Sequence, residues 1–174
     1  MFKLIVFAIV SSGITWYSWP YLRKPDSHGF YRFFAFESIL GLLLLNVNYW
    51  FDQPFSALQI ISWILLCLSI VLVIPGFYLL HQLGKPKDGI VDTTVLVKAG
   101  IYKYIRHPLY GSLLFLSWGI FLKSVSPLSG GLVLVATVFV VATARVEEAE
   151  NIQKFGEAYI AYIKTSKRFL PFLI

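Results

Sequence analysis

The sequence has few of the residues from which soluble catalytic centres are commonly built. Among its 174 residues there is one cysteine, only 14% are charged, and no pair of its three histidines has metal-ligand spacing. We expect His28 and His81 to be isolated in loops, and Cys67, inside an apolar stretch, to be a packed thiol. No P-loop, nucleophile elbow or strand-associated glycine-rich dinucleotide motif is present, which excludes a soluble Rossmann-type enzyme.

Apolar residues are correspondingly abundant. They make up 57% of the chain, and aromatic residues 17%, whereas soluble domains are about 45–50% apolar. The net charge of +6 comes from basic residues in short segments between apolar stretches. That pattern is typical of a polytopic membrane protein in contact with anionic lipid headgroups, and it does not indicate nucleic-acid or metal binding.

Five apolar stretches predict an all-α membrane bundle in a single domain of residues 1–174, with spans at about 2–21, 33–51, 57–80, 109–124 and 127–144. Of fifteen lysines and arginines, only Lys3 and Lys123 then lie outside. This predicts an external N-terminus and a cytosolic C-terminus. The first stretch has no cleavage site and is read as a retained span. Pro75 predicts a kink or early unwinding, and Gly111 and Gly119 predict close approach of the last two spans.

The helical period continues beyond the last span while the composition becomes polar. Ile152, Phe155, Tyr159 and Tyr162 recur at spacings of three and four. This predicts a C-terminal amphipathic cytosolic helix, bent at Gly156 and ending near residue 166. The basic and aromatic segment 167–172 is expected to lie on lipid headgroups.

Two groups of polar residues are predicted at the cytosolic border of the membrane. Arg106 and His107 precede Pro108, which favours a helix start, where backbone N–H groups and the helix dipole attract anions. The alternative is an ordinary membrane-entry loop. Glu147 and Glu148 follow the last span, and a ligand with an ammonium and a carboxylate would satisfy both groups. The alternative for the glutamates is a solvated helix face.

Glu37 is a carboxylate within the second predicted span. Ionisable residues inside a membrane are candidates for function by default. Two alternatives remain open for it: the side chain extends to the interface, or it pairs with Arg32.

The order of several motifs resembles that of the isoprenylcysteine carboxyl methyltransferase and phospholipid methyltransferase family. The resemblance covers roughly the C-terminal half, and it is carried by Gly100-Ile101-Tyr102, Arg106-His107-Pro108-Leu109-Tyr110, Glu147-Glu148, Phe155-Gly156, Tyr159, Tyr162 and Arg168-Phe169-Leu170-Pro171-Phe172. It implies an integral membrane enzyme that uses S-adenosylmethionine, with a cofactor-binding part at about residues 81–174.

Residue by residue, the resemblance implies a binding site for the cofactor. Its adenosyl part would contact Thr94, Val95, Leu96, Val97 and Tyr102, its amino-acid end would be surrounded by His107, Pro108, Leu109 and Tyr110, and Glu147 would bind its ammonium. Family members commonly carry an arginine four residues before this glutamate, where this chain has Thr143. Arg145 is the candidate to replace that arginine in catalysis, although it points elsewhere on a regular helix.

The resemblance implies methyl transfer to a lipophilic acceptor that enters laterally from the bilayer. The acceptor would be an isoprenylcysteine-like carboxylate, a phospholipid amine, a thiol or another lipid. If it is an amine, Glu148 or Glu37 would accept its proton. The competing interpretation is a non-catalytic membrane protein that binds lipid or assists assembly; a transporter is less well supported, because the spans lack a polar midplane.

Overall fold

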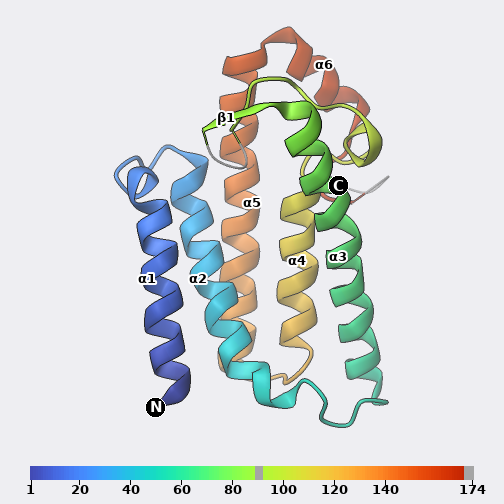
Figure 1. Ribbon diagram of the computed structural model, residues 1–174. Coiled ribbons are helices and arrows are strands. Elements are labelled where there is room, and N and C mark those ends of the chain that lie inside the picture. The colour runs from blue at the N-terminus through green and yellow to red at the C-terminus, as the bar shows by residue number, and fades with distance from the viewer. Residues whose placement is uncertain (89–91, 171–174) are drawn as a thin grey trace.

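The computed structural model describes residues 1–88 and 92–170 and is predominantly helical (Figure 1). In chain order the helices are α1 (Phe2–Leu22), α2 (His28–Asn46), the 3-10 helix η1 (Val47–Tyr49), α3 (Ala57–Gly84), the 3-10 helix η2 (Gly100–Lys103), α4 (Pro108–Phe121), α5 (Pro127–Phe155) and α6 (Glu157–Thr165). Two short antiparallel strands, β1 (Pro86–Asp88) and β2 (Asp92–Thr93), follow α3.

Four of the described helices are long and apolar enough to cross a membrane, namely those at 2–22, 28–49, 57–84 and 127–155. The prediction of a helical, membrane-type bundle is therefore confirmed. α4 is apolar but has only 14 residues, about 21 Å at 1.5 Å per residue, against a hydrocarbon core of roughly 30 Å. The predicted fourth span is thus a shorter helix than its neighbours.

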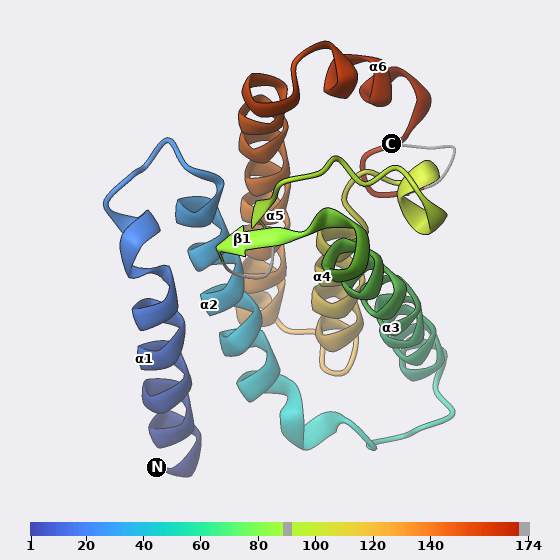
Figure 2. The same cartoon turned by 45° about the horizontal axis from the view of Figure 1, so that its top comes forward.

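The long helices and α4 form a curved row in which α1 and α3 are the outer members (Figures 1 and 2). Contacts are most extensive between α2 and α5 and between α3 and α4. A central cluster of apolar side chains from four helices fills the space between them: Ile39, Leu42, Leu66, Ile120, Val133 and Ala136. Van der Waals packing of these side chains stabilises the row where the helices meet.

The glycines of α4 face α3 and the C-terminal segment, and not α5 as predicted. A Cβ on Gly119 would lie 2.9 Å from Leu66 Cγ, and one on Gly111 would lie 3.1 Å from the carbonyl oxygen of Phe169. Ser62 of α3 also donates a hydrogen bond of 2.7 Å to the Gly119 carbonyl. Small residues therefore set the distance between α3 and α4.

α3 runs as one helix through Pro75 to Gly84, so an early unwinding is wrong, and the alternative of a kink at Pro75 stays a prediction. Proline removes one helix donor, and the remaining bonds of a long apolar helix suffice to continue it. The adjacent Gly76 allows α4 to approach, because a Cβ there would lie 3.2 Å from Pro108 and Leu109 side-chain atoms.

Three isolated side chains differ from expectation. Cys67 is exposed on α3, because its helix is an outer member of the row and this side faces away from the bundle. His81 lies in the last turn of α3, and not in a loop. His28 begins α2 and pairs with Glu150 of α5. Its backbone N–H donates to Glu150 Oε1 at 3.0 Å, and its ring Nδ1 lies 2.5 Å from Glu150 Oε2. This pair joins the ends of two helices that the sequence separates widely.

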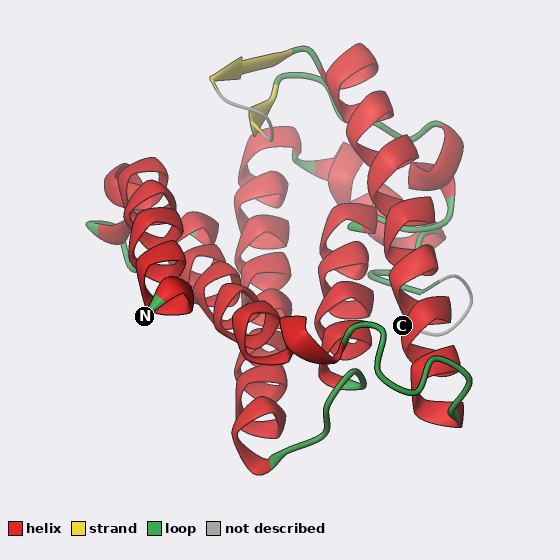
Figure 3. Cartoon of the chain, turned by 60° about the horizontal axis from the view of Figure 1, so that its bottom comes forward, coloured by secondary structure: helices red, strands yellow, loops and turns green. Residues whose placement is uncertain are grey.

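One end of the bundle is covered by the two strands, α6 and the segment after α6 (Figures 2 and 3). α5 ends at Phe155. Its C-cap is Gly156, whose φ of 57° lies in the left-handed region that glycine adopts readily, and α6 turns away there as predicted. The following segment returns to the bundle, and Phe169 is buried in one apolar cluster with Ala35 and Tyr110. In the described part of the tail Phe169 is buried and Lys167 is exposed, whereas Pro171 and Phe172 of the predicted surface segment lie outside the described residues.

Candidate functional site

The start of α4 is held by the segment that follows α6. Pro108 is the first residue of α4, and His107 is its N-cap with φ −124° and ψ 61°, in keeping with the bias that proline imposes on the preceding residue. The N–H of Arg106 donates to the carbonyl of Lys167 at 2.7 Å, and that of His107 to the carbonyl of Arg168 at 3.0 Å. These two bonds tie the residues before α4 to the segment after α6, and the anion site expected at the helix start stays a prediction.

Glu148 of α5 bridges the residues before α4 and the segment after α6, and we call this contact the junction. Its Oε1 accepts hydrogen bonds from Arg106 Nε at 2.9 Å and Arg168 Nε at 3.1 Å, and its Oε2 accepts one from Arg168 Nη2 at 2.7 Å. His107 Nε2 lies 3.3 Å from the same Oε1. The glutamate is buried, and its hydrogen bond raises the pKa of Arg168 above its ordinary value. A carboxylate with two arginine partners fixes the position of His107 and Arg106.

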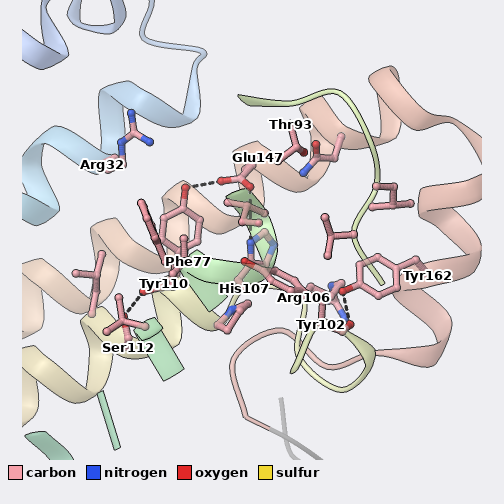
Figure 4. A pocket seen from close by; sticks show the side chains of 18 of the residues that line it. Arg32, Phe77, Thr93, Tyr102, Arg106, His107, Tyr110, Ser112, Glu147 and Tyr162 are labelled. Atoms are coloured by element: carbon pink, nitrogen blue, oxygen red, sulfur yellow. Dashed lines mark hydrogen bonds and ion pairs between the residues drawn. The ribbon is translucent and has the colours of Figure 1, made fainter. Parts of the chain in front are cut away.

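Glu147 points in a different direction from its neighbour. Tyr110 of α4 donates a hydrogen bond to Glu147 Oε2, and Glu147 Oε1 lies 3.9 Å from His107 Nδ1 (Figure 4). Successive side chains on a helix are separated by about 100° around its axis. Glu148 is thereby buried in the junction, while Glu147 reaches a cavity between the helices.

That cavity has a volume of about 340 Å³ and lies between the helices near the covered end of the bundle. Its size falls within the roughly 300–1,000 Å³ typical of small-molecule sites. Its walls come from every long helix, from α4 and α6, and from the connection between α3 and α4. Glu147 is its one acidic side chain among the described residues, and the remainder is mostly aliphatic and aromatic.

Two tyrosines close one side of the cavity (Figure 4). Tyr102 donates a hydrogen bond of 3.1 Å to the Gly76 carbonyl, and Tyr162 of α6 donates one of 2.5 Å to the Tyr102 carbonyl. Burial raises the pKa of Tyr162 to about 12. Burial, reinforced by the charge of Glu147, also raises the pKa of Tyr102. Both phenols stay neutral at physiological pH and act as fixed donors in the wall.

Most of the residues predicted to bind the cofactor meet in this cavity. Its lining includes Leu96, Val97, Tyr102, His107, Pro108, Leu109, Tyr110 and Glu147. They come from the α3–α4 connection, the start of α4 and the end of α5, which the fold brings together.

Thr94 and Val95 do not line the cavity; both are exposed. The N–H groups of both residues donate to the Gly84 carbonyl, at 2.9 and 3.1 Å, which makes a turn at the end of α3. That turn directs Thr93 into the lining instead. Gly84 permits this approach, because a Cβ there would lie 2.4 Å from Thr93 Cγ2.

The residues predicted to be catalytic are not among those that line the cavity. Glu148 is in the junction described above. Arg145 is exposed on α5. Glu37 accepts a hydrogen bond of 3.0 Å from Ser11 of α1 and pairs with that helix instead of Arg32. Thr143 is 1% exposed and donates to the Phe139 carbonyl at 2.7 Å, so this position packs within the bundle.

The lining also includes residues to which the sequence gave no role in binding, notably Arg32, Phe36, Asn151, Phe155 and Tyr159. A signal for some of them was available in the sequence. Asn151 and Phe155 follow Glu147 at intervals of four, and Phe36 follows Arg32 at the same interval. Such spacing places side chains on one helix face. That Arg32 faces this cavity depends on the packing of α2 against α5, which no local pattern specifies.

Residues 57–158 match the family model described as phospholipid methyltransferase. The matched region runs from the start of α3 into α6 and contains most of the cavity lining.

Three curated relatives are similar over parts of their length. The chain is 32% identical over 90 residues to methanethiol S-methyltransferase of Pseudomonas deceptionensis, covering 52% of this chain and 32% of that protein. It is 37% identical over 84 residues to protein-S-isoprenylcysteine O-methyltransferase of Mus musculus, covering 47% and 29%. It is 35% identical over 138 residues to the protein of that name in Saccharomyces cerevisiae, covering 68% and 56%. The chain thus spans well under two thirds of each relative.

Proposed function

The chain belongs to the phospholipid methyltransferase family, and from this premise we propose that it is an enzyme that transfers a methyl group from S-adenosylmethionine to a lipophilic acceptor at the cytosolic face of a membrane. The observation that carries the proposal is the lining of one ligand-sized cavity by His107, Tyr110 and Glu147 together with Leu96 and Val97. Relatives whose names specify methyl transfer to an isoprenylcysteine oxygen and to methanethiol sulfur support the reaction class.

The chemistry of the cavity suits this cofactor. Glu147 offers a carboxylate for an ammonium group, and its position is fixed by the hydrogen bond from Tyr110. His107 is buried beside this carboxylate, with its Nδ1 3.9 Å from Glu147 Oε1. Leu96, Val97 and the aromatic side chains of α6 provide apolar contact for a nucleoside. We propose Glu147 and the neighbouring lining residues as the cofactor site, with Thr93 in place of Thr94 and Val95.

S-adenosylmethionine, when bound, supplies an electrophilic methyl group on a sulfonium with a good leaving group. The protein then has to align the acceptor and exclude water. Phe36, Phe77 and Leu113 would exclude water from the acceptor side of the cavity. Glu148 would act as a positioning residue, because it holds Arg106 and His107 but does not line the cavity.

This site best suits acceptors that can be methylated without a base to remove a proton. Glu148 is fully engaged by arginines, and Glu37 is bonded to α1, so neither is available as a base in the cavity. Glu147 is the acidic group of the described lining, and we assign it to the cofactor. A carboxylate or thiolate acceptor attacks directly, whereas an amine would require a base. We therefore favour an isoprenylcysteine-like carboxylate or a lipophilic thiolate over a phospholipid amine.

The proposed topology has five membrane-crossing segments: the four long helices and the shorter α4, which is the fourth in chain order. α1 and α5 begin on the external side, and the junction of Glu148, α6 and the C-terminus lie on the cytosolic side. Lys123 is buried at the external end, where it donates to Gln59 at 2.9 Å and lies 3.6 Å from the centre of the Trp63 ring. α6 would cover the cytosolic mouth of the site, at the level of the headgroups.

Titration of the purified chain in detergent with S-adenosylmethionine tests the proposal. We expect the ligand to raise the melting temperature of the native chain, and Glu147→Gln and His107→Ala each to weaken its affinity at least tenfold. Glu157→Gln, which changes an exposed acid of α6, is the control. Affinity equal to that of the native chain in both site variants, or no binding at all, would contradict the proposal. A labelled-methyl assay on membrane lipid extract then identifies the product.

A further inference from the structure

Arg32 is a buried guanidinium that lines the cavity. It lies in the second turn of α2 and is 4% exposed. Arginine stays charged in proteins and carries five N–H donors. Burying a guanidinium without an anionic partner is costly. It is therefore informative to ask which anion pairs with Arg32.

The other basic side chains of the described lining have carboxylate partners. Arg106 donates to Glu148, and His107 lies near both Glu147 and Glu148. Arg32 takes part in none of the ion pairs among the described residues. Its guanidinium carbon instead lies 5.6 Å from the centre of the Tyr17 ring and 5.5 Å from that of Tyr21. Ring faces attract the charge but do not accept the N–H hydrogen bonds in the way an oxyanion does.

The nearby acids of α5 have hydrogen-bond partners other than Arg32. Glu147 accepts the hydrogen bond of Tyr110, and Glu150 pairs with His28. Glu37, the single acidic residue of α2, accepts a hydrogen bond from Ser11. The cavity thus presents a positive charge on its α2 side whose N–H donors are not matched by any of these carboxylates.

We propose that Arg32 binds an oxyanion of the methyl acceptor, so that the acceptor is a lipophilic molecule carrying a carboxylate or a phosphate. This inference rests on the proposed methyl transfer. Phe36 lies one turn from Arg32 on the same face of α2, and Leu113 lines the cavity from α4, so an apolar chain has a surface beside the anion. Figure 4 shows Arg32 on the α2 side, Tyr102 and Tyr162 on the opposite side, and Glu147 between them. Acceptor and cofactor would thus occupy opposite ends of one cavity.

Equilibrium binding to the whole purified chain in detergent tests the assignment with two matched pairs of probes. One pair is N-acetyl-S-farnesylcysteine and its carboxamide, and the other is a lysophosphatidic acid and the corresponding monoacylglycerol. We expect at least one anionic probe to bind tenfold or more tightly than its neutral partner, and the pair that responds identifies carboxylate or phosphate. Arg32→Met, which keeps an apolar stem, should reduce that preference to within about twofold, since charge-assisted hydrogen bonds are lost.

Arg23→Met is the matched control, because Arg23 also lies over a ring, 5.1 Å from the centre of that of Trp19, but is exposed and does not line the cavity. It should keep the preference of the native chain. If Arg32→Met does not fold, Arg32→Lys should still lower the preference at least threefold, because the planar fork is lost. Equal binding within both pairs, failure of both anionic probes to bind, or an unchanged preference in the Arg32 variant would overturn the assignment. Binding of S-adenosylmethionine measured in the same samples shows separately whether the proposed function stands.

Discussion

Glu147 and Glu148 are adjacent on α5, yet Glu147 accepts a hydrogen bond from Tyr110 at the cavity while Glu148 accepts hydrogen bonds from Arg106 and Arg168 outside it. The step of about 100° between neighbouring helix residues accounts for the divergence. One glutamate is thus available to a ligand, and the other joins the start of α4 to the segment after α6.

Glu148→Gln is expected to lower the stability of the protein. The amide cannot balance two guanidinium groups, and loss of one partner of a largely buried ion pair costs about 2–4 kcal/mol when part of the network stays hydrated. The melting temperature in detergent should fall markedly. Glu147→Gln should leave it within a few degrees of the native value, since this residue makes one hydrogen bond at the cavity. Equal melting temperatures for the two variants would contradict the division of roles.

Gly119→Ala is expected to destabilise the contact between α3 and α4. The new Cβ would lie 2.9 Å from Leu66 Cγ, so the helices or the leucine must shift, at a cost of about 1–3 kcal/mol. Gly131→Ala is the control within the bundle, since a Cβ there has nothing within 4 Å. Because alanine favours helix, that variant should be neutral or stabilised by up to about 1 kcal/mol. Thermal unfolding of both variants checks the pair, and a reversed order would refute the packing assignment.

Tyr162→Phe is expected to change how stability depends on alkaline pH. Burial raises the pKa of Tyr162 from 10.0 to about 12. The folded state therefore keeps a proton that the unfolded state loses, and stability is complete below pH 10 and falls as the pH rises towards 12. At pH 8 the variant should be less stable by about 0.5–1.5 kcal/mol through loss of one hydrogen bond.

The difference between the native chain and Tyr162→Phe should narrow as the pH is raised from 8 to 11. Tyr49→Phe, at an exposed tyrosine, should follow the native chain at both values. A difference that stays constant between pH 8 and pH 11 would show that the Tyr162 phenol does not titrate in this range in the way its burial requires.

Labelling of single cysteines tests the proposed orientation. Asp26 and Asp52 are both exposed, in the connections at opposite ends of α2. With Cys67→Ser as background, Asp52→Cys should react with a membrane-impermeant maleimide added outside sealed cells. Asp26→Cys should react only after permeabilisation. Reaction of both, or the opposite pattern, would exclude the proposed topology.

Several features of the site were predictable because they depend on short stretches of sequence. Pro108 fixes the start of α4 and leaves His107 as its N-cap. The glycine at 156 marks the end of α5. The prediction that the 96–97 segment, the start of α4 and Glu147 share one cavity came from the order of motifs, and not from periodicity.

Other features were not predictable from local patterns. At Cys67, Thr94 and Val95 the sequence did not specify which way the side chain faces. Apolar residues of a membrane helix look alike whether they meet lipid or another helix, since both surroundings are apolar. The partners of Glu37 and His28 likewise lie on different helices from the residues themselves.

The sequence by itself determined that the chain forms apolar helices of membrane-spanning length, because hydrophobicity and charge distribution act residue by residue. It also determined where α4 begins and where α5 ends, because proline and glycine act through the local backbone. Only the tertiary structure decided that Glu148 binds two arginines while Glu147 faces the cavity, and that Arg32 lines the same cavity. Those outcomes depend on how α2, α5 and the C-terminal segment pack, and that packing is set by contacts between residues far apart in the chain.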